Sequence, residues 1–288
     1  GHEVAGDIVA LGPGANRKIW KEGQRVAVRM LYSCGECYNC RTGHTNMCTQ
    51  AQRKPVREGM IPGPGGLCDQ IVVSTKDLFL IPDGISYEEA SLTEPLACCV
   101  HSIEIGDMQL GDDVVVIGGG IMGINHVMLA KRKGARVIIS EVDEERRKLA
   151  LSLGADVAIN PMECDVVEKV KELTGGRGAD VVFNTTAIPS VVPEAIAMTG
   201  SFGKMVQYSS MHPDAPVPVS PQMLHSTQKI LTGSISPTEI DFFRANRLIS
   251  SGIVDMKSLI AATFPFEKAQ DAFEKAIVPG TYRVIING

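Results

Sequence analysis

The sequence lacks three features that would place the protein in other classes. No run of lysine and arginine is long enough to attract a nucleic-acid backbone or anionic lipid, and 28 basic against 33 acidic residues leave a formal charge of −5. No stretch approaches the roughly twenty apolar residues that a membrane-spanning helix requires. The opening residues Gly1-His2-Glu3 contain neither an initiator methionine nor the basic start of a signal peptide. We therefore expect a cytoplasmic protein that binds neither nucleic acid nor membrane and whose natural start lies upstream.

What is present predicts two domains. The 288 residues are 44% hydrophobic and 21% charged, which is enough apolar side chain for a full core. Residues 1–95 are rich in glycine, proline and short β-branched runs, so we expect a β-rich domain there. Residues 236–288 return to a mixed character and should complete it. The expected strands of this domain lie at 6–11, 25–28, 70–73 and 282–286. A helix is expected at 266–273.

Residues 96–235 have a different pattern, in which short apolar runs alternate with helical periods. This alternation predicts an α/β domain with a parallel sheet and crossover helices. The apolar runs are at 113–117, 136–140, 157–159, 180–184, 203–208 and 229–235. Six strands are the number that a doubly wound dinucleotide-binding domain requires.

Cysteine is concentrated in one place. Cys34, Cys37, Cys40 and Cys48 have a C-x2-C-x2-C-x7-C spacing that lets one loop wrap four thiolates around a tetrahedral ion. We expect structural zinc, because protein fills all four positions. An iron–sulfur cluster, two disulfides or unrelated thiols are the alternatives. The other cysteines are expected to be small buried hydrophobic residues, and they are Cys68, Cys98, Cys99 and Cys164.

A glycine turn follows the apolar run that ends at Ile117. Gly118, Gly120 and Gly123 form G-x-G-x-x-G between a predicted strand and a predicted helix. In that context glycines permit a tight turn and close approach of a pyrophosphate, which the helix N-terminus attracts. We therefore expect this turn, Met122 included, to bind a dinucleotide.

An acid follows the next predicted strand, where a cofactor ribose is expected. Glu141 stands eighteen residues after Gly123 and could accept both ribose hydroxyls while repelling a 2′-phosphate, which favours NAD over NADP. The alternative is a solvated acid at the start of a helix. Arg146 could reach the adenosine from that helix or form a surface ion pair.

Together the motifs resemble the zinc-containing medium-chain alcohol dehydrogenases, and most of all their sorbitol and threonine dehydrogenase branch. The resemblance covers essentially the whole chain. Its motifs, in chain order, are Gly1-His2-Glu3 with Gly6, Gly12 and Ala15, the four cysteines, Gly65-Gly66-Leu67-Cys68, Glu94-Pro95-Leu96-Ala97 and the glycine turn. It implies a GroES-like catalytic domain over 1–95 and 236–288, and a Rossmann NAD-binding domain over 96–235.

The resemblance also implies a catalytic zinc at His2, Glu3 and Glu94. Imidazole and carboxylate suit zinc, and an incomplete protein shell leaves room for a substrate oxygen. Neighbouring side chains on a strand point to opposite faces, so His2 and Glu3 can both bind only if the strand is bulged; otherwise one acts from behind the other. Glu94 precedes a proline and is therefore expected in extended conformation.

The implied activity is NAD-dependent interconversion of a secondary alcohol or polyol with its ketone. In the family, a first cysteine ligand and a proton-relaying group precede Gly-His-Glu, so this chain is expected to be truncated at its N-terminus. The alternative is therefore a non-catalytic NAD-binding fragment or sensor. Residues 234–238 lack the basic and aromatic pair of the polyol branch. A basic loop contains Arg53, Lys54 and Arg57, and it is either a site for an anionic substrate or a solvated surface loop.

Assembly is predicted from the sixth strand. The segment 229–235 ends the predicted sheet and carries one charge in an otherwise apolar run. An open edge of this kind recruits a partner strand, so we expect a homodimer or homotetramer, as the resemblance also implies. The alternative is that the proline-rich segment 213–221 covers the edge within one chain.

Overall fold

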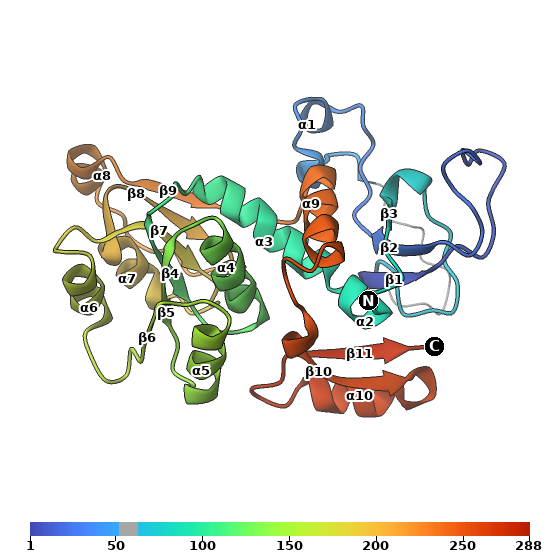
Figure 1. The fold of residues 1–288 in the computed structure, drawn as a ribbon. Coiled ribbons are helices and arrows are strands. Elements are labelled where there is room, and N and C mark those ends of the chain that lie inside the picture. Colours follow the sequence, from blue (N-terminus) through green and yellow to red (C-terminus); the bar gives the residue numbers. More distant parts are fainter. Residues whose placement is uncertain (52–62) are drawn as a thin grey trace. The chain divides into compact units, whose positions relative to one another are not determined.

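The computed structural model describes residues 1–51 and 63–288 (Figure 1). Arg53, Lys54 and Arg57, the basic loop considered above, lie outside the described residues. The chain divides into two compact units: Gly1–Cys98 with Ser236–Gly288, and Cys99–Ile235.

The described residues of the first unit form two small sheets. One is antiparallel with the order β1-β2-β3, and the other is a parallel pair of β10 and β11. Their strands are β1 (Glu3–Asp7), β2 (Arg25–Arg29), β3 (Leu78–Leu80), β10 (Ile260–Pro265) and β11 (Arg283–Asn287). Alternate residues of β2, Val26 and Val28, are buried with Ile8 and Met30 in a small core.

The strand expected at residues 70–73 is not formed, and this prediction is wrong. Ile71 and Val73 pack against the core of the first unit, but residues 70–73 are in no strand of the part of the chain that the structure describes. The ladder position beside β2 is occupied by Leu78–Leu80 instead. A β-branched run becomes a strand only when a neighbour is available to share its backbone hydrogen bonds, and the sequence pattern does not reveal that neighbour.

Helices of the first unit begin at capping residues. Ser86 caps α2 and Thr238 caps α9, each in a reciprocal capping box with the acid three residues later. The helices longer than one 3₁₀ turn are α1 (Tyr38–Arg41), α2 (Tyr87–Ser91), α9 (Glu239–Ser250) and α10 (Ala269–Ala276).

Helix α3 (Thr93–Gly106) belongs to both units and corrects one expectation. Glu94 lies in its first turn and is helical, not extended as the following proline suggested. The N–H of Leu96 donates to the carbonyl oxygen of Leu92, so the helix starts directly after α2. Pro95 is tolerated here because backbone N–H groups in the first turn of a helix have no partner within the helix, so the missing N–H of proline costs no hydrogen bond.

The second unit is a six-stranded parallel sheet, as predicted. Its strand order is β6-β5-β4-β7-β8-β9. Successive strands are added on one side of β4 as far as β6 and on the other side from β7 onward, which is the doubly wound arrangement. The strands are β4 (Asp113–Ile117), β5 (Arg136–Ser140), β6 (Val157–Ile159), β7 (Ala179–Asn184), β8 (Thr199–Gln207) and β9 (Ile230–Gly233). β9 is the edge strand, as expected.

Helices cover both faces of this sheet (Figure 1). Val166 and Val170 of α6 and Met198 of α7 pack against one face, which includes Val115 and Val182. On the opposite face α4 packs against β4 and β5, and α5 packs against β5 and β6. The helices are α4 (Ile121–Arg132), α5 (Glu144–Ser152), α6 (Val166–Leu173), α7 (Val191–Met198) and α8 (Pro221–Thr227). Strands buried on both faces explain why their sequences read as continuous apolar runs.

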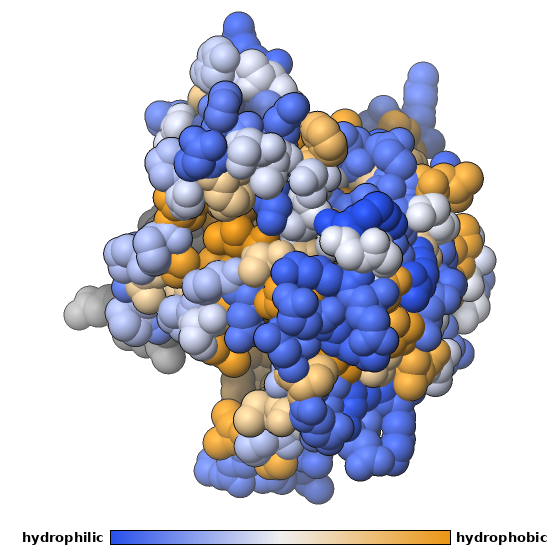
Figure 2. All heavy atoms as spheres, turned by 90° about the vertical axis from the view of Figure 1, so that its left-hand side faces the viewer, coloured by the Kyte–Doolittle hydropathy of each residue, from blue (hydrophilic) through white to orange (hydrophobic). Residues whose placement is uncertain are grey.

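The outer surface near α6 is mostly hydrophilic (Figure 2). Lys169 pairs with Glu172 and Lys171 with Glu168 along the exposed side of this helix. Apolar residues interrupt the polar surface in smaller groups. Within the described parts of the chain, no helix combines the length and the apolar character needed to cross a membrane.

Candidate functional site

The four clustered cysteines converge in the first unit around α1 and the turns beside it. Their sulfur atoms all lie within 4.8 Å of one another. The Sγ atoms of Cys34 and Cys40 are 3.9 Å apart, and so are those of Cys37 and Cys48. Four sulfurs placed tetrahedrally at about 2.3 Å from zinc are about 3.8 Å apart. The cluster therefore fits a zinc ion with a closed, structural ligand set.

Backbone N–H groups donate to these sulfurs and favour their thiolate form, which is the form that binds a metal ion. The N–H of Cys37 donates to Sγ of Cys34 at 3.3 Å, and that of Cys34 donates to Sγ of Cys48 at the same distance. Such bonds lower the pKa of Cys34, and the N–H of Cys40 likewise lowers the pKa of Cys37 to about 5. Desolvation raises the pKa of Cys40 to about 12, so a cation is needed before all four become thiolates.

A buried ion cluster anchors the base of this four-cysteine lobe. The guanidinium of Arg29, which is 0% exposed, donates to Asp77 at 2.6 Å and to Glu239 at 2.8 Å. Ser33, next to the first cysteine, donates to the same Glu239 oxygen at 2.8 Å. Farther along the lobe, Asn46 donates to the carbonyl oxygen of Ser236. The lobe is thereby attached to the segment with which the chain re-enters the first unit.

A second group of metal-ligating side chains contains His2, Glu3 and Glu94. One ligand atom of each lies within 4.8 Å of the others, and Nε2 of His2 is 3.8 Å from Oε2 of Glu94. β1 begins only at Glu3 and pairs with β2 without a bulge, so His2 precedes the strand and is free of its alternation. The bulge considered above is therefore not needed. One imidazole and two carboxylates suit zinc and leave a coordination position for another ligand.

Glycine keeps His2 at this place. The N–H of Gly66 donates to the carbonyl oxygen of Gly1 at 2.9 Å. A Cβ on Gly66 would lie 2.4 Å from a methyl carbon of Val4 and 2.8 Å from that oxygen. Only glycine allows this approach, which fixes the backbone that carries His2.

Sequence reasoning missed two residues that contact the group. Arg283, from β11, binds both carboxylate oxygens of Glu3, with Nε 2.9 Å from Oε2. Cys98, one turn after Glu94 on α3, donates its thiol to that carboxylate at 3.4 Å. The sequence signalled neither contact, because Glu94 was expected in extended conformation and Arg283 lies far from Glu3 along the chain.

Burial controls the charge of Glu94. The residue is 7% exposed, and this desolvation, reinforced by the negative charge of Glu3, raises the pKa of Glu94 to about 7. The thiol of Cys98 and the charge of Arg283 act in the opposite direction. A buried carboxylate that is costly to ionise alone is one that a cation would stabilise.

In the second unit, the glycine turn connects β4 to α4. Gly118 has a φ of 95°, in the left-handed region that favours glycine, and Gly120 is the N-cap of α4. A Cβ on Gly123 would lie 1.8 Å from the carbonyl oxygen of Gly118, so no side chain fits there. Met122 lies in the first turn of the helix. The turn thus leaves backbone N–H groups at a helix N-terminus accessible to an anion.

Glu141 lies directly beside this turn, at the carboxyl end of β5. Its carboxylate accepts from the N–H of Gly119 at 2.5 Å and from that of Asp143 at 2.8 Å. Arg146 lies near as well, since a Cβ on Gly119 would be 3.2 Å from the Cβ of Arg146. The structure therefore brings together the six residues expected to bind the cofactor: Gly118, Gly120, Met122, Gly123, Glu141 and Arg146.

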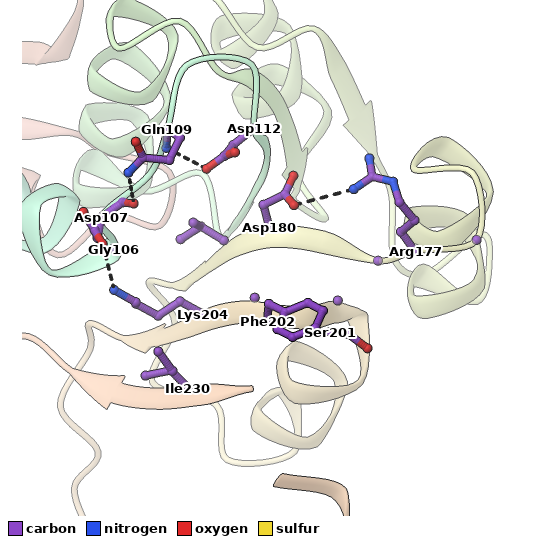
Figure 3. A pocket seen from close by; sticks show the side chains of 15 residues that line it. Gly106, Asp107, Gln109, Asp112, Arg177, Asp180, Ser201, Phe202, Lys204 and Ile230 are labelled. Carbon is purple, nitrogen blue, oxygen red and sulfur yellow. Dashed lines mark hydrogen bonds and ion pairs between the residues drawn. The ribbon is translucent and has the colours of Figure 1, made fainter. Parts of the chain in front are cut away.

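A pocket of about 690 Å³ lies at the opposite, amino end of the same sheet (Figure 3). Lys204 points from β8 toward the end of α3, where it donates to the carbonyl oxygen of Ile105, and Arg177 pairs with Asp180. Phe202 lies along the pocket on a bulge of β8 and has a left-handed φ of 63°. The cations that line the pocket are already paired with acids or carbonyl oxygens. The pocket contains none of the site residues expected from the sequence.

The remaining cysteines are only partly as expected. Cys99 is buried, and Cys98 is half-buried against Glu94. Cys68 and Cys164 are exposed, so the expectation that all four are buried is wrong for these two. Both lie in loops, where a small side chain has no core to enter.

Comparison with known families matches both units. Residues 1–83 match the family described as alcohol dehydrogenase GroES-like domain, and residues 122–251 match the family described as zinc-binding dehydrogenase. With the six-stranded parallel sheet, these matches confirm the expected combination of a GroES-like and a Rossmann fold.

Individual relatives extend over most of the chain. A sorbitol dehydrogenase from Bacillus subtilis is 31% identical over 283 residues, covering 96% of this chain and 76% of the relative. An L-threonine 3-dehydrogenase from Pyrococcus horikoshii is 30% identical over 289 residues, covering 99% and 80%. Among solved structures, a zinc-binding dehydrogenase from Sinorhizobium meliloti bound to NADP superposes with a TM-score of 0.90 at 26% identity, covering 100% of this chain and 82% of that one.

Proposed function

Because the chain belongs to the zinc-containing medium-chain dehydrogenases, the family of sorbitol and threonine dehydrogenases, we propose that it transfers a hydride between NAD and a secondary alcohol or polyol. The observation that carries this proposal is the convergence of His2, Glu3 and Glu94 in a chain that also has the glycine turn. A metal-ligating group alone would support many activities, and so would a dinucleotide fold.

Each residue has a role in this proposal. His2 and Glu94 would hold the catalytic zinc, and Glu3, fixed by Arg283, would complete or orient that set of ligands. Zinc, when bound, lowers the pKa of the alcohol hydroxyl, and NAD accepts the hydride. Burial of Glu94 excludes water from one side of the metal group. The four-cysteine lobe binds the structural zinc and takes no part in the reaction.

For the cofactor we propose NAD rather than NADP. Glu141 places a carboxylate beside the turn, where a ribose 2′-hydroxyl would find an acceptor and a 2′-phosphate would meet a negative charge. Gly118, Gly120, Met122 and Gly123 form the pyrophosphate site at the start of α4. Arg146 would lie over the adenosine.

We also propose the domain boundaries and the assembly. The GroES-like catalytic domain comprises 1–95 and 236–288, and the Rossmann domain comprises 96–235. Ile230, on the edge strand β9, is 49% exposed, so pairing of this edge with a second copy would cover it in a homodimer or homotetramer.

Metal analysis combined with a substrate screen tests the proposal. We expect two zinc ions per chain and reduction of NAD with at least one member of a panel of polyols, amino alcohols and secondary alcohols. His2→Ala should remove one zinc and the activity, whereas His44→Ala, in the lobe but outside its ligand set, should change neither. One zinc per chain with NADH binding and no turnover would favour the alternative, a non-catalytic NAD-binding module.

A further inference from the structure

Next to the glycine turn, side chains connect the carboxyl ends of two strands, β4 and β7. Thr185, the first residue after β7, donates its hydroxyl to the carbonyl oxygen of Ile117 at 2.7 Å and lies 3.3 Å from that of Gly118. Its N–H donates to the same Ile117 oxygen at 3.0 Å. Ile117 ends β4 and Gly118 opens the turn, so Thr185 fixes the start of the turn from the neighbouring strand.

The same hydroxyl is in close contact with two of the three motif glycines. A Cβ on Gly118 would lie 3.0 Å from Oγ1 of Thr185 and 2.8 Å from a methyl carbon of Thr186. A Cβ on Gly123 would also lie 3.0 Å from Oγ1 of Thr185. The turn is therefore packed against this loop, and its glycines are required partly by Thr185.

Asn184, the last residue of β7, supports that loop. It is 0% exposed, and its Oδ1 accepts from the N–H of Thr186 at 3.1 Å and from its hydroxyl at 2.8 Å. Its Nδ2 donates to Gln207 at 2.9 Å, and Gln207 donates to the carbonyl oxygen of Ser209 at 2.7 Å. One buried amide thus sets the loops after both β7 and β8.

The position of this network in the sheet gives it a functional meaning. The strand order reverses between β4 and β7, and in doubly wound sheets the dinucleotide binds in the crevice at that point. Glu141 lies on the β5 side of the crevice. Thr185 and Asn184 lie on the opposite side, at the end of β7, where the half of a bound dinucleotide away from the adenosine would lie.

The network also has an electrostatic consequence. The carbonyl oxygens of Ile117 and Gly118 lie at the base of the turn, next to the hydroxyl of Thr185. This hydroxyl donates to the oxygen of Ile117, and Glu141 binds the N–H of Gly119, so the N–H groups at the start of α4 are the ones left to face an anion.

We propose that Thr185 is a positioning residue for the dinucleotide, which holds the glycine turn in the conformation that binds the pyrophosphate. Asn184 keeps the Thr185 loop in place from below. This inference rests on the proposed binding of NAD and extends it to residues outside the glycine motif.

Two substitutions at Thr185 and one control test the role. Thr185→Val keeps the shape of the side chain and removes the donor, whereas Thr185→Ser keeps the donor. The control is Thr199→Val at the amino end of β8, because Thr199 also donates to a carbonyl oxygen, that of Ala195, at 2.7 Å. The dissociation constant of NADH is measured by fluorescence titration, and the Tm of each variant is measured alongside.

We expect Thr185→Val to raise the Kd for NADH about five- to tenfold, since one hydrogen bond to the turn is lost. Thr185→Ser should bind within about twofold of the parent protein. Thr199→Val should lose a similar amount of Tm and keep the parent Kd. The inference is overturned if Thr185→Val binds NADH like the parent, or if Thr199→Val weakens binding equally. If the parent itself does not bind NADH, the proposed function fails first, and this inference falls with it.

Discussion

Replacing Glu94 by glutamine should stabilise the zinc-free protein at alkaline pH. Burial, and then the charge of Glu3, raise the pKa of Glu94 from 4.5 to about 7. The folded state therefore binds this proton more tightly than the unfolded state does. Its contribution to stability is complete below pH 4.5 and is lost as the pH rises through 7. Glutamine does not ionise, so the Glu94→Gln variant should not show this loss.

The size of the effect follows from the pKa. Each pH unit between the ordinary pKa and the folded pKa corresponds to 1.36 kcal/mol, so ionised Glu94 costs about 3 kcal/mol of folding free energy at pH 8. The glutamine variant should be more stable than the parent by about 1–3 kcal/mol at pH 8. The gain is less than the full cost of ionisation, because an amide oxygen accepts the hydrogen bond of the Cys98 thiol more weakly than a carboxylate does. With about 2–4 °C per kcal/mol for a chain of this size, the Tm at pH 8 should rise by about 2–12 °C.

Thermal unfolding of chelator-treated protein between pH 5 and pH 9 measures this difference. Glu104→Gln is the matched control, because Glu104 is an exposed acid on the same helix, paired with Lys133 at the surface. The Tm of the parent should fall relative to that of Glu94→Gln as the pH rises from 5 to 7 and should stay lower above pH 7, whereas Glu104→Gln should follow the parent. Added zinc should reverse the order, since a cation favours the carboxylate. Parallel curves for parent and Glu94→Gln without zinc would refute the reasoning.

Four further predictions concern the other sites. Arg29→Met should cost about 3–5 kcal/mol, because Asp77 stays buried without its partner, and Arg29→Met with Asp77→Asn should recover part of the loss; urea unfolding with an unchanged midpoint for the single variant would contradict this. Cys40→Ser should lower the zinc content by one ion per chain and lower the Tm, and elemental analysis that still finds the parent content would exclude the closed site. Glu141→Gln should raise the Kd for NADH about tenfold and bring the affinities for NADH and NADPH closer together, so an unchanged ratio would remove this residue from cofactor selection. Ile230→Lys should shift the mass measured by light scattering toward a single chain if β9 pairs with a second copy; a variant that keeps the parent mass would place the interface elsewhere.

Much of the Rossmann unit could be predicted from sequence, because its signals are local. The central strands β4, β5 and β7 are buried on both faces, so each is a short apolar run, and β4, β5 and β6 have the predicted bounds. In the first unit the strands other than β2 are only partly buried. There the run at 70–73 was indistinguishable from a strand, whereas the strand beside β2 is β3 at Leu78–Leu80.

The candidate site divides in the same way. His2, Glu3 and Glu94 could be picked out from motifs, but their approach to within 4.8 Å depends on the fold. The helical conformation of Glu94 was mispredicted because the rule for residues before proline describes an isolated dipeptide, and here α2 leads directly into α3. Cys98 faces Glu94 only because of that helix.

The sequence by itself determined the features whose partners are close along the chain: the cysteine lobe and the glycine turn. Residue spacing and the glycines mark both features in the sequence, although contacts from Thr185 and Glu239, which are distant along the chain, support them in the fold. Only the tertiary structure decided the pairing of Arg283 with Glu3 and the burial of Arg29 between Asp77 and Glu239. A charged side chain selects its partner through desolvation and distance, and both exist only after strands far apart in sequence have packed together.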